Sequence, residues 1–103
     1  MEDKVKLTML MDFYANLLSE SKKQVMIDYV ENDFSLSEIA SLKNVTRQAA
    51  YDIVKKAEQQ LYGYEAKLGL VERFVNAKAM LTELSENLDD KSKKKIQNII
   101  NNL

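Results

Sequence analysis

The segment from residue 35 to residue 61 constrains the fold most, because it carries two helix starts on either side of one tight turn. Ser35 stands three residues before Glu38, a spacing typical of the capping box at a helix start. Asn44 tolerates the left-handed conformation that ends helices, and Thr46 is a good N-cap for a second helix. That second helix has an apolar stripe of Ala50, Ile53, Val54, Ala57 and Leu61. Two short helices, a tight turn and a capped second helix predict a helix-turn-helix.

The same segment predicts which side chains face inward and which face outward. The first helix is expected over 36–42, where Ala40 is small enough for the two helices to approach closely. Val45 is expected to turn back into the core. In a DNA-binding helix-turn-helix the start of the second helix enters the major groove. The candidate nucleic-acid-binding residues are therefore Thr46, Arg47, Gln48, Tyr51, Lys55 and Lys56.

The charge on this second helix is small. Arg47 can reach a guanine edge or a phosphate, whereas Asp52 stands on the same outward face and repels phosphate. Four basic and three acidic residues between 47 and 67 leave a net charge of +1. The affinity for nucleic acid is therefore expected to be modest and to fall with salt.

Two resemblances rest on these residues. The segment 17–61 resembles region 4, the C-terminal DNA-binding region of bacterial sigma factors. The phrases VTRQAAYD at 45–52 and LSEIA at 36–40, with LMDFY at 10–14 and LYGYEAKL at 61–68, are similar to the YlxM family of small bacterial proteins. This second resemblance covers most of the chain. It implies a role in the signal recognition particle pathway, with the particle RNA or the particle GTPase as partner.

The chain departs from the family pattern at one pair of residues. Leu42 and Lys43 stand exchanged, because the pattern expects the apolar residue immediately before Asn44. Either Leu42 packs from one position earlier or Lys43 lays its aliphatic stem inward.

Composition supports an all-α fold and argues against the commonest kinds of catalytic and metal-binding site. The chain has 103 residues, no proline and two glycines, with 46% apolar and 30% charged residues. Without cysteine or histidine it has no disulfide, no thiolate nucleophile and no imidazole base or ligand. We expect no enzyme, no cofactor and no metal. Its short apolar runs stay below the ~18 residues of a membrane span, and its acidic start is unlike a signal peptide. A cytoplasmic location is therefore expected.

Helical spacing predicts further helices on both sides of the motif. One is expected over 3–18 with Asp3 as its cap, and another over 20–31 with Ser19 as its cap. The predicted fold is a small helical bundle with a sigma region 4-like helix-turn-helix and a long helical C-terminal extension. The predicted domains are 1–68 for the bundle and 69–103 for the extension, which is a candidate dimerisation element.

An apolar seam with alternating spacings of four and three residues continues past the motif. Its later positions are predicted to bind a second copy of the chain: Ala57, Leu61, Tyr64, Leu68, Val71 and Val75. Gly69 leaves two alternatives open. Either one helix runs through to about residue 84, or the helix breaks near Gly69 and another begins at Leu70.

The C-terminal third carries apolar stripes that need a cover. Asp89 and Asp90 suit the start of a last helix, and the stripes are Phe74, Ala77, Leu81, Leu84 and Leu88, followed by Ile96, Ile99, Ile100 and Leu103. An intramolecular hairpin or a second copy of the chain would cover them, and we favour a homodimer. The basic run at 91–95 is expected to be a solvated helix face.

Three functions are compatible with these observations. The first is a role in the signal recognition particle pathway through nucleic-acid binding by the second helix of the motif. The second is a sequence-specific DNA-binding transcriptional regulator. The third is a protein-interaction module that contacts the signal recognition particle GTPase. A shared fold does not choose between them.

Overall fold

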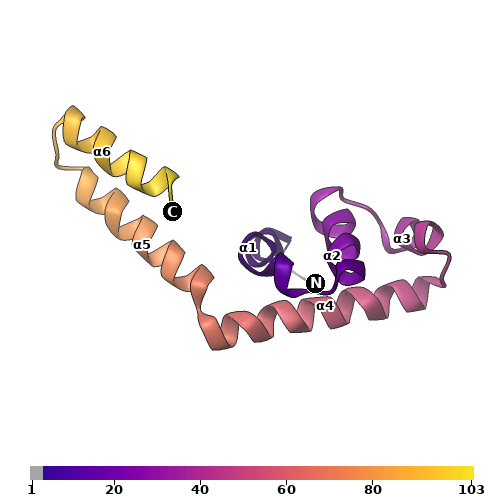
Figure 1. Ribbon diagram of the computed structural model, residues 1–103. Helices are drawn as coiled ribbons and strands as arrows, with labels where there is room; N and C mark the ends of the chain where they lie inside the picture. Colours follow the sequence, from indigo (N-terminus) through magenta and orange to yellow (C-terminus); the bar gives the residue numbers. More distant parts are fainter. Residues whose placement is uncertain (1–3) are drawn as a thin grey trace. The chain divides into compact units, whose positions relative to one another are not determined.

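A computed structural model describes residues 4–103, and in this range the chain is helical without a β-strand. The predicted all-α fold is confirmed. Asp3, the predicted first cap, lies outside the described residues. The α-helices are α1 (Lys4–Tyr14), α2 (Glu20–Met26), α3 (Leu36–Lys43), α4 (Arg47–Leu68), α5 (Leu70–Ser85) and α6 (Asp90–Asn101), as Figure 1 shows. Among the described residues, no helix combines the length and the apolar character needed to span a membrane.

The chain folds as two compact units, one ending at Leu68 and the other comprising Gly69–Leu103. In the first unit α4 is the longest helix and contacts each of α1, α2 and α3 (Figure 1). The buried side chains of α4 lie along one stripe at helical spacing, and they meet Leu7, Leu10, Met11 and Tyr14 of α1, Val25 and Met26 of α2, and Ile39 and Ala40 of α3 in the core. This apolar core holds the helix-turn-helix in place.

The first two predicted helices are interrupted by changes of helical pitch. The helix predicted over 3–18 leaves α geometry after Tyr14 and continues as a 3₁₀ turn, η1 (Ala15–Leu17). The helix predicted over 20–31 begins where expected, since the Ser19 hydroxyl accepts a hydrogen bond from the Lys22 N–H at 3.3 Å. Its last part is a π-helical segment, η2 (Ile27–Glu31). An apolar stripe does not predict such changes, because it marks the buried face and not the backbone hydrogen-bond partner.

An ion pair joins the start of α1 to Asp33, the second residue after η2. The Lys4 ammonium donates to the Asp33 carboxylate at 2.7 Å and lies 4.7 Å from the centre of the Tyr29 ring. This hydrogen bond and the charge of Lys4 lower the pKa of Asp33. Asp33 has a left-handed backbone, with φ of 56°. The pair lies on the surface, where the chain turns out of η2 towards α3, and the Phe34 N–H donates to the Asp28 carbonyl at 2.9 Å within this turn.

The turn of the helix-turn-helix is closed by backbone hydrogen bonds. Ser35 and Glu38 form the predicted capping box, and Asn44 is left-handed with φ of 56°, as expected. The Asn44 N–H donates to Ser41 and the Val45 N–H donates to the Ala40 carbonyl at 3.0 Å. This pair of bonds is the Schellman motif.

Two predictions about side chains in this turn are wrong. Val45 does not enter the core but is 38% exposed, because its backbone N–H and not its side chain holds the turn. Neither proposed packing of the exchanged pair is found. Leu42 is 65% exposed, and Lys43 reaches across to α2, where its ammonium donates to the Ser21 hydroxyl at 3.1 Å.

Gly69 ends the long helix, so the second of the two alternatives is correct. Its backbone is left-handed, with φ of 64°, which is the conformation that glycine adopts most readily at the end of a helix. The carbonyl of Gly69 then accepts the first hydrogen bond of α5, from the Arg73 N–H at 3.0 Å. The two helices α4 and α5 are therefore separate elements.

The predicted dimer seam divides at this break. Ala57 and Leu61 are completely buried against other helices of their own unit, so they are core residues and are unavailable to a second copy. This part of the seam prediction is wrong. Tyr64 is half-buried, and its hydroxyl donates to the Leu17 carbonyl of the same unit at 3.1 Å. Beyond Tyr64, Val71 is buried, while Leu68 and Val75 are exposed.

The second unit is an antiparallel pair of helices. The last helix starts at Asp90, where Asp89 and Asp90 predicted a start, and the Asp89 carboxylate caps it by accepting a hydrogen bond from the Ser92 N–H at 2.8 Å. Hydrogen bonds from the backbone and the hydroxyl of Ser92 lower the pKa of Asp89. Ile96 and Ile100 of α6 are buried in the pair, which Figure 1 shows side by side. The hairpin therefore covers part of the C-terminal stripes without a second copy.

Candidate nucleic-acid interface

The first turns of α4 present most of the predicted nucleic-acid-binding residues to solvent. Thr46 is the N-cap, and its hydroxyl accepts a hydrogen bond from the Ala49 N–H at 3.0 Å. Arg47, Gln48 and Lys56 are exposed, and Tyr51 is 40% exposed. Lys55 is half-buried. The apolar stripe on the opposite side of α4 is buried, so the exposed face of the helix is the one that carries these residues.

Helical spacing arranges the outward residues in two neighbouring rows. One row contains Arg47, Tyr51 and Lys55, in which the Lys55 ammonium lies 5.7 Å from the centre of the Tyr51 ring. The other contains Gln48, Asp52 and Lys56.

The side chains of the second row are linked to one another. The Gln48 amide donates to the Asp52 carboxylate at 3.1 Å. Asp52, the only acid in these two rows, is therefore hydrogen-bonded to Gln48. A nucleic acid that binds Gln48 would compete with this hydrogen bond.

Glu58, one of the three acidic residues counted between 47 and 67, is only 3% exposed. Its carboxylate lies 3.5 Å from the Lys55 ammonium, which is partly open to solvent. A cation beside a buried carboxylate offsets part of the cost of its burial. A signal was present in the sequence, because Glu58 stands four residues after Val54 and three before Leu61, the spacing of the buried stripe. The positive charge of Lys55 is thus shared with a carboxylate of the same helix.

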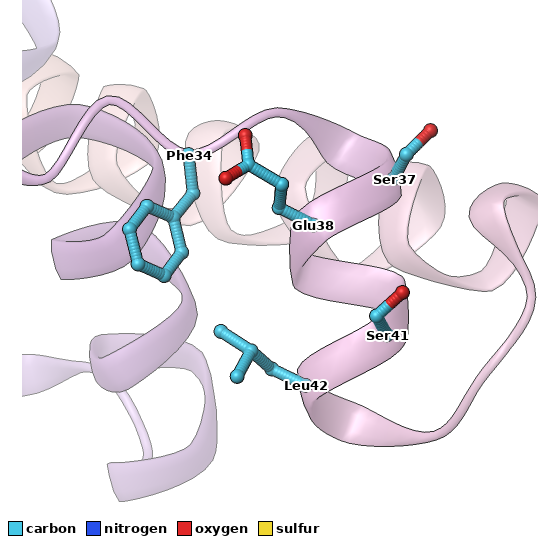
Figure 2. Close-up of a pocket in the computed structure, with 5 residues that line it drawn as sticks. All are labelled: Phe34, Ser37, Glu38, Ser41 and Leu42. Atoms are coloured by element: carbon cyan, nitrogen blue, oxygen red, sulfur yellow. The ribbon is translucent and has the colours of Figure 1, made fainter.

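The outer side of α3 carries an apolar pocket that sequence analysis did not identify as a site. Phe34 and Leu42 form its apolar lining, with Ser37, Glu38 and Ser41 around them. Figure 2 shows the Phe34 ring and the Leu42 side chain on the same side of α3, with the Glu38 carboxylate above the ring. Glu38 is already engaged in the capping box, so the pocket offers chiefly apolar contact.

Titratable groups give no sign of a metal centre in the part of the chain that the structure describes. No three acidic side chains between residues 4 and 103 come together in a way that would hold an ion. The outward face of α4 therefore remains the candidate site with the clearest chemical character, which combines arginine, lysine, amide and aromatic groups on one helix.

Comparison with known sequences decides the family. The family described as "Putative helix-turn-helix protein, YlxM / p13 like", UPF0122, matches residues 1–101. The chain belongs to the UPF0122 family.

Individual members of the UPF0122 family are similar over nearly the whole length. A UPF0122 protein of Fusobacterium nucleatum subsp. nucleatum is 41% identical over 103 residues, covering 100% of this chain and 97% of the relative. One of Clostridium perfringens strain 13 is 38% identical over 111 residues, covering 98% and 99%. One of Clostridium botulinum strain Alaska E43 is 41% identical over 91 residues, covering 88% and 84%. The resemblance to YlxM is thereby confirmed, and the helix-turn-helix of this UPF0122 chain is a feature of its family.

Proposed function

We propose that this protein binds nucleic acid through the outward face of α4 and acts in this way in the signal recognition particle pathway. The observation that carries the proposal is the exposure of Arg47, Gln48 and Tyr51 on the first turns of a helix whose other side is buried. The N-terminal residues of the second helix are those that contact bases in helix-turn-helix proteins. The pathway itself comes from the resemblance to YlxM.

The weak charge of this face favours a structured target over any available phosphate backbone. Non-specific binding relies on lysine and arginine that displace counterions, and here Asp52 and the shared charge of Lys55 limit that contribution. Tyr51 offers a ring on which an unstacked base can lie, a contact that is common in RNA recognition. The particle RNA is therefore the preferred target, and a sequence-specific operator in duplex DNA is the alternative.

The test is fluorescence anisotropy of the full chain at low and at physiological salt, against the particle RNA and against random-sequence duplex DNA. Preference for the RNA that persists at physiological salt is the expected result. Duplex binding alone would assign the chain to transcriptional regulation. Absence of binding to both nucleic acids by the folded protein would contradict the proposal.

Arginine offers a matched pair of variants for the same assay, because the chain has only Arg47 and Arg73. Arg47→Ala should weaken binding by about 1–3 kcal/mol if it contacts a base, or lower the salt slope by about 1 if it contacts a phosphate. Arg73→Ala, on exposed α5, should leave both unchanged. Equal losses in the two variants would show that α4 is not the contact surface.

A second candidate function is favoured by the pocket on α3. Phe34 and Leu42 give an apolar surface suited to a protein partner, and the resemblance to YlxM names the signal recognition particle GTPase as the first partner to test. Leu42→Glu should weaken binding to the GTPase without changing the anisotropy titration. Arg47→Ala should have the opposite pattern.

A further inference from the structure

The C-terminal hairpin leaves a row of large apolar side chains in solvent. On α5 and the turn after it, Met80 is 65% exposed, Leu84 is 62% exposed and Leu88 is 37% exposed. Met80 and Leu84 stand four residues apart, which places them along one line of α5, and Leu88 lies in the turn that follows. They also line a shared shallow pocket together with Glu83 and Asn87. These side chains form one continuous apolar strip.

The last helix carries a matching strip. Ile99 is 51% exposed and Leu103, just beyond the end of α6, is 54% exposed. They stand four residues apart, beside the line of Ile96 and Ile100 that packs on α5. The two strips together, Met80, Leu84, Ile99 and Leu103, are called here the hairpin face.

Helix geometry puts both strips on the same side of the hairpin. Met80 precedes the half-buried Leu81 by one residue, and Ile99 precedes the buried Ile100 by one residue. One residue corresponds to a rotation of about 100° around a helix axis. In an antiparallel pair of right-handed helices, the residue that precedes a contact residue lies on the same side of the pair in both helices. Met80 and Ile99 therefore lie on one side.

The charges beside this face differ between the two helices. Residues 70–89, which comprise α5 and the turn, carry four acidic and two basic side chains, a net charge of −2. Residues 90–103 carry one acidic and four basic side chains, a net charge of +3. A two-fold axis parallel to the helices would place α5 of one copy over α6 of the other, so that each acidic helix meets a basic one. Such a self-complementary surface is what an isologous dimer requires.

We infer that the hairpin face is covered by the hairpin face of a second copy of this chain, which makes an antiparallel four-helix bundle from two C-terminal units. Such bundles bury the apolar stripes among four helices instead of two. This interface goes beyond the proposed function and does not depend on it. It also differs from the seam predicted from the sequence, because it uses neither Ala57 nor Leu61.

The test is the mass of the full chain by sedimentation equilibrium across a concentration series. The wild-type protein should approach twice 11.9 kDa. The double variant Met80→Glu with Leu84→Glu should raise the dimer dissociation constant about 100-fold or more, since two central apolar contacts are lost. Val75→Glu is the matched control. Val75 is also exposed on α5, but it comes one residue after the half-buried Phe74 and therefore lies on the side of the hairpin opposite Met80. Circular dichroism checks that each variant stays helical.

Charge reversal tests the orientation of the two copies. Glu83→Lys and Lys95→Glu should each weaken the dimer, and the two changes combined in one chain should restore it. A wild-type chain that stays monomeric up to its solubility limit would overturn the inference. So would a dimer that survives the Met80 and Leu84 changes, or one that Val75→Glu abolishes.

Discussion

The two units of this protein differ in how they satisfy their apolar side chains. In the unit that ends at Leu68, three helices pack on α4, and large residues such as Tyr14 and Leu61 are fully buried. In the unit from Gly69 to Leu103, two helices pack on each other, and Met80 and Leu84 remain mostly in solvent. Both units use the same amphipathic helices and the same kinds of cap. The number of helices that meet, rather than the apolar pattern of each one, decides whether a stripe becomes a core.

This difference leaves the two units with different kinds of surface. The first unit has a core that fixes its outward α4 face without help from a partner. The second unit keeps an apolar surface available for association. The same amphipathic pattern therefore gives a buried core in one unit and an exposed apolar surface in the other. Substitutions of the same type should change the free energy of unfolding by different amounts in the two units.

The largest difference is expected between Leu61→Asp and Leu84→Asp. Leu61 is completely buried, so a carboxylate there loses the packing of the leucine and enters an apolar core. The free energy of unfolding should fall by about 4 kcal/mol or more. Leu84 is 62% exposed, and its replacement should change the stability of a dilute chain by about 0.5 kcal/mol or less. Urea denaturation followed by circular dichroism measures both, and equal losses would contradict the contrast between the units.

The next effect concerns the neighbouring lysines of α4. Lys55→Ala removes the cation beside buried Glu58, and the free energy of unfolding should fall by about 1–2 kcal/mol. Loss of a fully buried partner costs more, but the Lys55 side chain is 40% exposed. Lys56→Ala should change stability by about 0.5 kcal/mol or less because Lys56 is exposed. The same urea assay compares them, and a Lys56 effect as large as that of Lys55 would count against a stabilising role for the pair.

Removing one cap in each unit should give similar but differently located effects. Ser35→Ala and Asp89→Ala each delete a side-chain acceptor at a helix start. The change at Ser35 should cost about 1 kcal/mol, and the change at Asp89 should also lower stability. Amide hydrogen exchange should show the first loss at the start of α3 and the second at the start of α6. Loss of protection throughout 4–68 from the Asp89 change would show that the two units unfold together.

The smallest effect is expected in acid. The pKa of Asp33 and that of Asp89 are both lowered in the folded chain, so each carboxylate contributes stability above the pKa of the unfolded chain, about 3.9. That contribution is lost as the pH falls through the lower, folded pKa. Asp33→Asn and Asp89→Asn should therefore reduce the dependence of stability on pH below about 4. Denaturation at a series of pH values measures this, and unchanged curves would contradict it.

Local signals predicted the motif well. The caps at Ser19, Ser35 and Thr46 and the left-handed Asn44 were all expected from residue type and spacing, because a cap depends on atoms within three or four residues. The helix start beside Asp89 was also expected. The start of the second helix at Arg47 followed from the same signals. That the α4 face contacts nucleic acid stays a prediction.

The features that sequence analysis missed depend on distant contacts or on backbone choices that residue type leaves open. Glycine at 63 continues α4 whereas glycine at 69 ends it, and both are compatible with helix or with its end. Glu58 lies in the buried stripe although a charge suggests solvent. The spacing of Ala57 and Leu61 is the same whether the two residues pack in a core or in a dimer interface. Periodicity shows which face is apolar, and it does not show which helix covers it.

The exposed Val45 gives the protein a practical point of attachment. The chain has no cysteine, so Val45→Cys would create its single thiol. The turn is held by the Val45 N–H rather than by the side chain, and a fluorophore coupled there would sit beside the first turn of α4 without disturbing the core. One labelled chain could then report RNA binding through a change in emission, and pairing of two copies through energy transfer between donor and acceptor dyes.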